Sequence, residues 1–235
     1  VASISGGTDI IGCFLAGSPI LPVHRGELQC AQLGMDVQSW DTDGKPVFGQ
    51  SGELVCTQPF PSMPVGFWND EDGSKYQEAY FDDFDGVWTH GDYVEMTANG
   101  GAIIYGRSDT TLNPSGIRIG TAEIYRAVEN MKLIVDAVVV GRPNEGDIDV
   151  VLCVKLTTGT DLDEKLESDI RGLIRSATTP RHVPKYIFEV DDIPYTISGK
   201  KVEKAVLATI TGRKVGNKDA LANPESLKQY STLSF

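Results

Sequence analysis

Two short segments in the first half of the chain carry side chains whose types and spacing could handle a polar, charged substrate. SGGTDIIG (5–12) places a hydroxyl and a carboxylate, Thr8 and Asp9, in a glycine-rich turn. WTHGDY (88–93) places Asp92 at the entry to an expected strand, where its carboxylate can accept hydrogen bonds from two neighbouring hydroxyls. Taken singly, each segment is also an ordinary turn, because Gly, Asp and Thr are common in turns.

Two further segments supply positive charge. Arg107 lies two residues before Asp109, and PYTISGKK (194–201) presents Lys200 and Lys201 on a Ser-Gly turn. A lysine pair on a loop is most often a solvated surface feature. The alternative is that one lysine supplies a positive charge to bound anions, as active sites require.

The elements that must position these residues change type along the chain. Over the first hundred residues we expect strands and turns, with strands in 26–40 and 52–57 and a hairpin over 92–106 that turns at Asn99-Gly100. After residue 110 the expected helices are 121–130, 162–175 and 201–210, and the expected strands are 135–141, 149–156 and 185–190. Strands that alternate with helices predict an α/β unit with a short sheet flanked by helices.

The two patterns meet inside YGRSDTTLNPSGIRIGTAEI (105–124). Its Gly, Asn, Pro and Ser content is typical of a plain surface turn, and Arg107 and Arg118 flank its centre. The change of pattern indicates a domain boundary near Asp109. We therefore expect a mixed α/β fold, with a small β-rich unit over 1–109 and an α/β unit over 110–235.

Composition excludes several classes of partner. The 235 residues include 21 Lys and Arg against 33 Asp and Glu, a net charge of −12, which argues against binding to nucleic acid or an anionic membrane. No run approaches the roughly 18 apolar residues of a membrane span, and no signal peptide is recognisable. The four cysteines lack the spacing of metal ligands, so we expect unpaired thiols in a reducing compartment, the cytosol: Cys13, Cys30, Cys56 and Cys153.

In their order and spacing, the four segments resemble the adenylate-forming superfamily of acyl-CoA synthetases, peptide-synthetase adenylation domains and luciferases. LNPSGIRIGTAEIYRAV (112–128) is similar to the segment after the hinge in the acetyl-CoA and acetoacetyl-CoA synthetase branch. Three further stretches resemble the acetoacetyl-CoA members of that branch: 52–70, 181–201 and 217–227. The resemblance covers essentially the whole chain.

The resemblance implies an ATP-dependent ligase that first joins acetoacetate to AMP, releasing pyrophosphate, and then passes the acyl group to coenzyme A. The implied small molecules are acetoacetate, ATP, Mg²⁺ and coenzyme A, and the oligomeric state stays open. The chain opens at Val1 without Met, and the Ser/Thr/Gly-rich phosphate loop of the family is not among its residues. We therefore expect a C-terminal fragment that is inactive alone. The alternatives are a ligase for another short- or medium-chain acid and a non-catalytic module that retains the fold.

Matching by motif assigns roles in the first half-reaction. Thr8 would hydrogen-bond the α-phosphate, and Asp9, in place of the more usual Glu, would help to hold Mg²⁺. Asp92 would bind the ribose hydroxyls, with Arg107 supporting the same sugar. Lys200 would bridge the substrate carboxylate and the α-phosphate, drawing together two anions that must approach each other.

Other residues match positions used in the second half-reaction. Asp109 matches the hinge about which the C-terminal domain swings, removing Lys200 from the site. Gly116 would then line the pantetheine channel, and Arg118 would contact the adenylate phosphate. Arg175 lies where this branch has a basic residue for the 3′-phosphate of coenzyme A.

The chain departs from the family pattern at three positions. Where acetyl-CoA synthetases carry a tryptophan that closes the acyl pocket, this chain has Gly6, which implies room for a larger acid unless neighbouring residues refill the space. His90 stands where a small hydroxyl residue is usual, which bears on the nearby ribose or adenine contact. Thr110 stands where the family often repeats the acidic residue of the hinge.

Overall fold

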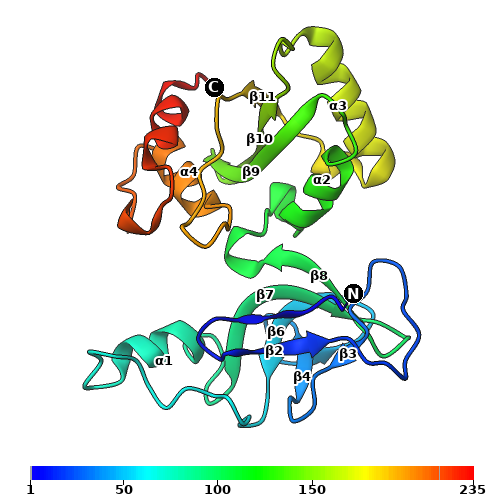
Figure 1. The fold of residues 1–235 in the computed structure, drawn as a ribbon, viewed down its shortest axis with the longest axis vertical. Helices are drawn as coiled ribbons and strands as arrows, with labels where there is room; N and C mark the ends of the chain where they lie inside the picture. The colour runs from blue at the N-terminus through cyan, green and yellow to red at the C-terminus, as the bar shows by residue number, and fades with distance from the viewer. Residues whose placement is uncertain (1, 217) are drawn as a thin grey trace. The chain divides into compact units, whose positions relative to one another are not determined.

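The structure, a computed structural model, describes residues 2–216 and 218–235, and of Gly116 it describes only the backbone. The chain divides into two compact units, Val1–Asp109 and Thr110–Phe235 (Figure 1). The first unit is mainly β, and the second combines one sheet with helices. The expected mixed α/β fold class is therefore confirmed.

The first unit contains two antiparallel sheets. The three-stranded sheet has the order β1-β2-β3, with bounds β1 (Ser5–Gly7), β2 (Gly12–Ala16) and β3 (Cys30–Ala31). The five-stranded sheet has the order β5-β4-β6-β7-β8, with bounds β4 (Val37–Trp40), β5 (Pro46–Val47), β6 (Ser51–Cys56), β7 (Trp88–Met96) and β8 (Ala102–Arg107). Both sheets contribute to one buried apolar core, with Phe14 from β2, Leu54 from β6 and Trp88 from β7.

The β7–β8 hairpin was predicted from sequence and is confirmed, although β7 begins earlier, at Trp88. Gly100 adopts φ 79°, a left-handed conformation that glycine tolerates, and so closes the turn after Asn99. The register of the hairpin places Asp92 directly opposite Arg107. Side chains on opposed residues of an antiparallel pair lie on one face, so the register alone brings these two charges together.

Two elements of this unit differ from the sequence expectation. The segment 5–12, expected as a turn alone, forms β1, a turn and the start of β2, since a three-residue strand with two glycines carries no apolar alternation. Helix α1 (Ser74–Tyr80) was not expected. Its seven residues pack on the core mainly through Tyr76 and Tyr80, which is too short an apolar stripe to mark a helix in the sequence.

The second unit is built on a three-stranded sheet of order β11-β10-β9, comprising β9 (Ile134–Asn144), β10 (Asp147–Leu156) and β11 (Tyr186–Glu189). β10 pairs antiparallel with β9 and parallel with β11. The α-helices are α2 (Thr121–Val128), α3 (Glu164–Ala177) and α4 (Glu203–Ile210). Short 3-10 segments follow the loops: η1 (Ser108–Thr110), η2 (Pro114–Gly116), η3 (Pro180–His182), η4 (Lys218–Ala220) and η5 (Pro224–Thr232).

Helices cover both faces of this sheet (Figure 1). One core cluster joins Val139 of β9 to Ile170 of α3 and to α2. The other joins the neighbouring Val138 to Val206 of α4 and to η5. Because successive residues of a strand face opposite sides, a strand buried on both faces reads as a continuous apolar run, as the sequence shows here.

Among the described residues, no helix combines the length and hydropathy that crossing a membrane demands. The same residues bring no three His, Cys, Asp or Glu side chains into a metal-binding arrangement. All four cysteines carry free thiols, with Cys56 and Cys153 buried.

Candidate active site

The middle of β7 and the end of β8 assemble a chain of opposite charges in the first unit. Nη1 of Arg107 donates to Oδ1 of Asp92 at 3.3 Å and to the carbonyl oxygen of His90 at 2.9 Å. Nε of Arg107 lies 3.7 Å from Oδ1 of Asp109. Oδ2 of Asp92 accepts a hydrogen bond from the Ser5 hydroxyl at 3.3 Å. The structure thus brings together three of the residues singled out from sequence: Asp92, Arg107 and Asp109.

A glycine makes room for this arginine. Gly91 has φ 78°, and a Cβ built there would lie closer than 3.0 Å to the guanidinium of Arg107. A side chain at this position would therefore displace Arg107 from Asp92, and the backbone conformation also favours glycine. The spacing His90-Gly91-Asp92 is thus part of the geometry that fixes the arginine.

His90 contributes through its backbone and through packing. Its ring meets Phe14 edge-on at 4.7 Å between centroids, and Cε1 would lie 2.8 Å from a Cβ on Gly7. Burial lowers the pKa of His90, although nearby Asp92 opposes the shift, so the imidazole is neutral at pH 7. The residue that departs from the family pattern therefore packs inside the unit and supplies a carbonyl oxygen to Arg107.

Thr8 and Asp9 lie on the turn between β1 and β2, and both are exposed. The backbone carbonyl of Thr8 accepts from the N–H of Ile11 at 3.1 Å, which closes the turn. Oδ2 of Asp9 accepts a hydrogen bond from the Tyr80 hydroxyl, and the Tyr80 ring stacks on Trp88 at 3.7 Å. One carboxylate oxygen of Asp9 is thus anchored to the core, and within the described part of the chain the other has no hydrogen-bond partner.

Gly6 lies in β1, where the backbone of β2 approaches closely. A Cβ built on Gly6 would lie closer than 3.0 Å to the carbonyl oxygen of Gly12 and to Cα of Cys13. The direction that a side chain would take is therefore occupied by β2. Close packing of two strands is a sufficient physical reason for this glycine, independent of the size of an acyl pocket.

We expect Gly6→Ala to lower the free energy of unfolding by about 1–3 kcal/mol, because β1 and β2 must separate to admit the methyl group. The matched control is Gly172→Ala in α3, where the added Cβ meets no atom within 4 Å. Since alanine favours helix over glycine, that variant should be unchanged or more stable by up to about 1 kcal/mol. Chemical denaturation of both variants measures the difference, and equal stabilities would contradict the close-packing explanation.

A half-buried carboxyl group that sequence reasoning missed lies beside this site. Oε1 of Glu53 in β6 accepts a hydrogen bond from the Ser108 hydroxyl at 3.0 Å, one residue before Asp109. Burial raises the pKa of Glu53 to about 7, while hydrogen bonds from Ser108 and the Gly91 backbone oppose the shift. The only signal in the sequence was a charged residue inside an otherwise apolar strand.

Because its pKa is raised, Glu53 should make the free energy of unfolding depend on pH. The protonated carboxyl stabilises the fold fully below its ordinary pKa of 4.5, and this contribution is lost as pH rises through about 7. We therefore expect Glu53→Gln to be as stable as the wild type near pH 4.5 and more stable by about 1–2 kcal/mol at pH 8, after allowance for solvent screening.

The measurement is the difference in unfolding free energy between the two proteins as a function of pH. The difference is needed because the lowered pKa of His90 acts in the opposite sense, with stability lost as pH falls below the ordinary value of 6.5. A difference that stays constant from pH 4.5 to pH 8 would show that Glu53 does not titrate in this range.

In the second unit, Lys200 lies at the end of a tight turn. The Thr196 N–H donates to the carbonyl of Lys200 at 2.8 Å, and the Gly199 N–H donates to the carbonyl of Thr196 at 2.8 Å. Oγ1 of Thr196 accepts from the Lys200 N–H at 3.0 Å, and Gly199 adopts φ 79°. The Thr-Ile-Ser-Gly sequence therefore fixes the backbone that carries Lys200.

The two adjacent lysines differ in what they contact. Nζ of Lys201 lies 2.6 Å from Oδ1 of Asp136 and 4.6 Å from the centroid of the Tyr125 ring. Asp136 also accepts from the Tyr195 hydroxyl, which fastens both ends of the turn to β9. Lys200 is exposed, and in the described ranges its ammonium forms no ion pair. Lys201 is therefore held by the fold, and Lys200 is available to a ligand.

The remaining residues singled out from sequence lie on separate segments of the second unit. Arg118 is exposed and follows η2. Gly116 is the last residue of η2, and its surroundings lie outside what the structure describes. Arg175 is exposed in the last turn of α3. Asn217, the first residue of the resembling stretch 217–227, also lies outside the described residues.

Comparison with known proteins shows what this chain is similar to. Residues 123–200 match the model of the AMP-binding enzyme C-terminal domain, a range that ends at Lys200. The chain is 57% identical to the acetoacetyl-coenzyme A synthetase of Rhizobium meliloti (strain 1021), over 99% of this chain and 36% of the relative. A solved structure of acetoacetyl-CoA synthetase from Streptomyces lividans matches with a TM-score of 0.92 and 44% identity, over 98% of this chain and 35% of that one. Almost the whole chain is therefore similar to acetoacetyl-CoA synthetases.

This similarity confirms the resemblance that the four motifs indicated. The acetoacetyl-CoA synthetase of Danio rerio, at 51% identity over 99% of this chain and 35% of its own length, gives the same result. This chain thus spans about a third of the length of the adenylate-forming relatives that it matches.

Proposed function

We propose that a full-length protein carrying this chain is an acid–thiol ligase that forms acetoacetyl-CoA. A carboxylate oxygen of acetoacetate attacks the α-phosphorus of ATP and pyrophosphate leaves. The coenzyme A sulfur then attacks the acyl carbon of the adenylate, and AMP leaves. The observation that carries the substrate is the 57% identity to the Rhizobium meliloti acetoacetyl-coenzyme A synthetase over almost the entire chain.

Lys200 serves the first step. Its ammonium lies on a turn whose backbone is hydrogen-bonded, so little conformational freedom of the backbone is lost when it binds. Placed between the substrate carboxylate and the α-phosphate, it offsets the repulsion between them and the charge that builds up as the bond forms. The neighbouring Lys201 is unsuited to this role because Asp136 already holds it.

Asp92 and Arg107 serve the nucleotide. The carboxylate of Asp92 accepts hydrogen bonds from the two ribose hydroxyls, displacing the weaker contact with Ser5. Arg107, fixed by the His90 carbonyl, orients the carboxylate through a charge-assisted hydrogen bond. Thr8 donates its hydroxyl to the α-phosphate from the exposed turn before β2.

Asp9 fits a role as a magnesium ligand. Magnesium in nucleotide sites keeps several waters and takes only one or two carboxylates, with phosphate oxygens supplying the rest. The oxygen of Asp9 that Tyr80 leaves open meets that requirement, and the hydrogen bond to Tyr80 orients the carboxylate. A bound Mg²⁺ would spread the negative charge that accumulates as pyrophosphate leaves.

The two units divide the two half-reactions. In this proposal residues 1–109 end the AMP-binding domain, residues 110–235 form the mobile C-terminal domain, and Asp109 is the hinge. After the C-terminal domain has swung about the hinge, Arg118 binds the adenylate phosphate and Gly116 lines the pantetheine channel. Arg175 binds the 3′-phosphate of coenzyme A. The enzyme acts in the cytosol.

The test is an acid-dependent exchange of pyrophosphate into ATP, measured on the full-length protein with acetoacetate, acetate, propionate and butyrate. We expect the highest kcat/KM with acetoacetate. A preference for propionate or butyrate would mean that acetoacetate is not the substrate. Failure to bind ATP would favour a non-catalytic module. Because Gly6 faces β2, selectivity for acetoacetate has to arise from other residues of the pocket as well.

A further inference from the structure

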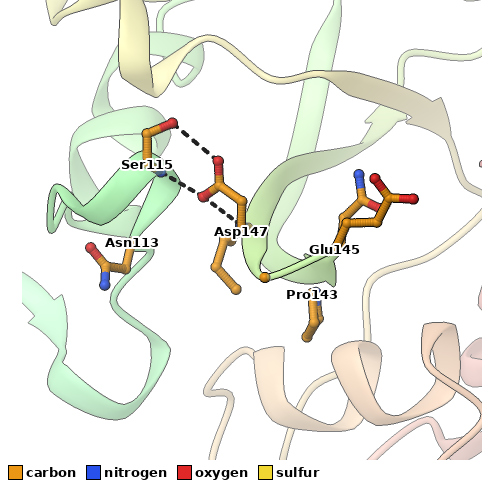
Figure 2. A pocket seen from close by; sticks show the side chains of 8 residues that line it. Asn113, Ser115, Pro143, Glu145 and Asp147 are labelled. Atoms are coloured by element: carbon orange, nitrogen blue, oxygen red, sulfur yellow. Dashed lines mark hydrogen bonds between the residues drawn. The ribbon is translucent and has the colours of Figure 1, made fainter.

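The segment Leu112–Ile119, here called the 112–119 hairpin, lies against the turn between β9 and β10. Leu112 and Ile119 close the hairpin by two backbone hydrogen bonds of 3.0 and 2.8 Å. Between the hairpin and the turn is an open hollow of about 730 Å³, lined from the hairpin by Asn113 and Ser115 (Figure 2). The hairpin carries Gly116 and Arg118, which the proposed function assigns to thioester formation.

One carboxylate spans this hollow. Oδ1 of Asp147 accepts from the Ser115 N–H at 2.6 Å, and Oδ2 accepts from the Ser115 hydroxyl at 3.1 Å (Figure 2). Ser115 adopts φ 52°, a left-handed conformation that is uncommon for serine. The two hydrogen bonds to an ionised acceptor stabilise this conformation at the residue before Gly116.

The position of Asp147 is itself fixed. Glu145 and Gly146 adopt φ 47° and 88°, which makes a two-residue turn of the type that matches the twist of paired strands. Oδ1 of Asp147 also accepts from the Ile148 N–H at 2.7 Å. The hydrogen bond from the Ser115 backbone is the largest cause that lowers the pKa of Asp147, so the group is a carboxylate at neutral pH.

The base of the hairpin is held by apolar packing. Leu112 and Ile119 are buried in the core of the second unit. A Cβ on Gly141 of β9 would lie 2.9 Å from Cδ2 of Leu112, so this glycine allows the hairpin to approach the sheet. Packing thus secures the base, and Asp147 secures the apex.

We propose that Asp147 is a positioning residue for thioester formation: by holding Ser115, it presets the backbone that presents Gly116 and Arg118. This inference rests on the proposed function. It assigns Asp147 to the second half-reaction alone, because Lys200, which serves the first, lies on a separate turn closed by its own hydrogen bonds with Thr196.

The test compares the two half-reactions in the full-length protein. Asp147→Ala should slow thioester formation from supplied acetoacetyl-adenylate and coenzyme A about tenfold, since two hydrogen bonds to a charged group are lost. Pyrophosphate exchange should be unchanged. Asp147→Asn, whose amide oxygen can still accept from the Ser115 N–H, should recover most of the rate.

Glu145→Gln is the matched control, because it removes an equal charge from the same turn. The Glu145 side chain points away from Ser115 (Figure 2), so neither half-reaction should change. Equal losses of both half-reactions in Asp147→Ala, or no loss in either, would overturn the inference while leaving the proposed function intact.

A second measurement does not depend on the reaction. Hydrogen exchange of the Ser115 amide in the 235-residue chain should accelerate about tenfold in Asp147→Ala, while amides of β9 and β10 stay protected and so report a folded unit. Unchanged exchange at Ser115 would overturn the positioning role. If the wild-type full-length protein forms no adenylate, the proposed function fails, and the exchange result still decides whether Asp147 holds the hairpin.

Discussion

Replacing Lys200 by alanine in the full-length protein should lower the rate of adenylate formation about 10²- to 10³-fold, the usual effect of removing one preorganised positive or hydrogen-bonding group. The reason is electrostatic, because two anions then approach each other without a compensating charge. Thioester formation from supplied acetoacetyl-adenylate should be spared. Pyrophosphate exchange and single-turnover thioester formation measure the two steps separately.

The adjacent lysine provides the control for this experiment. Lys200 is exposed, so Lys200→Ala should unfold at the wild-type temperature. Lys201→Ala leaves the largely buried Asp136 without its cation and should lower the free energy of unfolding by about 1–2 kcal/mol, between the effects for exposed and buried pairs. If Lys200→Ala instead lost both half-reactions equally, the assignment of this lysine to the first step alone would be wrong.

The second large effect is expected at Asp92. Asp92→Asn keeps the shape of the side chain and removes the charge that pairs with Arg107 at 3.3 Å. An amide offers a single acceptor oxygen, so the ribose hydroxyls lose one partner and Arg107 loses one of the carboxylates that it contacts. We expect kcat/KM for ATP to fall about 10²-fold, mainly through a higher KM. The reason is that a site built to hydrogen-bond a substrate hydroxyl binds much more weakly when one of its buried polar groups is removed.

Ser5→Ala is the control for Asp92. It removes a donor to the same carboxylate and leaves the pair with Arg107 in place. Its KM for ATP should stay within a factor of about 3, because a single neutral hydrogen bond contributes little net free energy. Equal effects of the two substitutions on KM would indicate that Asp92 acts through general packing and has no direct role in nucleotide binding.

Sequence alone was sufficient for the elements with strong local signals. Apolar periodicity marked α3, the doubly buried strands β9 and β10 read as apolar runs, and Asn99-Gly100 marked the β7–β8 turn. Helix α1 was missed because its seven residues have only a short apolar face, Tyr76 and Tyr80, which packs on the core without being fully buried.

The site residues found by motif were those with an unusual residue type at a fixed spacing. Glu53, Asp136 and Asp147 were missed, because each becomes informative only through a partner far away in the sequence. Residue type could not distinguish Lys200 from Lys201 either, because the two side chains are identical and only the ion pair with Asp136 separates them. Long-range partners such as these follow from the tertiary fold and leave no local pattern.

The turn that carries the two lysines has a further consequence for how the chain can vary. Tyr195 and Lys201 are bridged across it, and neighbouring residues on such an extended segment project to opposite sides. Inserting one residue between Pro194 and Lys200 would therefore bring Lys200 to the place where Lys201 now meets Asp136, and deleting one would bring Val202 there. The number of residues in this turn therefore matters as much as which residues they are. Among related sequences, insertions and deletions should be rarer in this turn than in the other surface turns of the second unit.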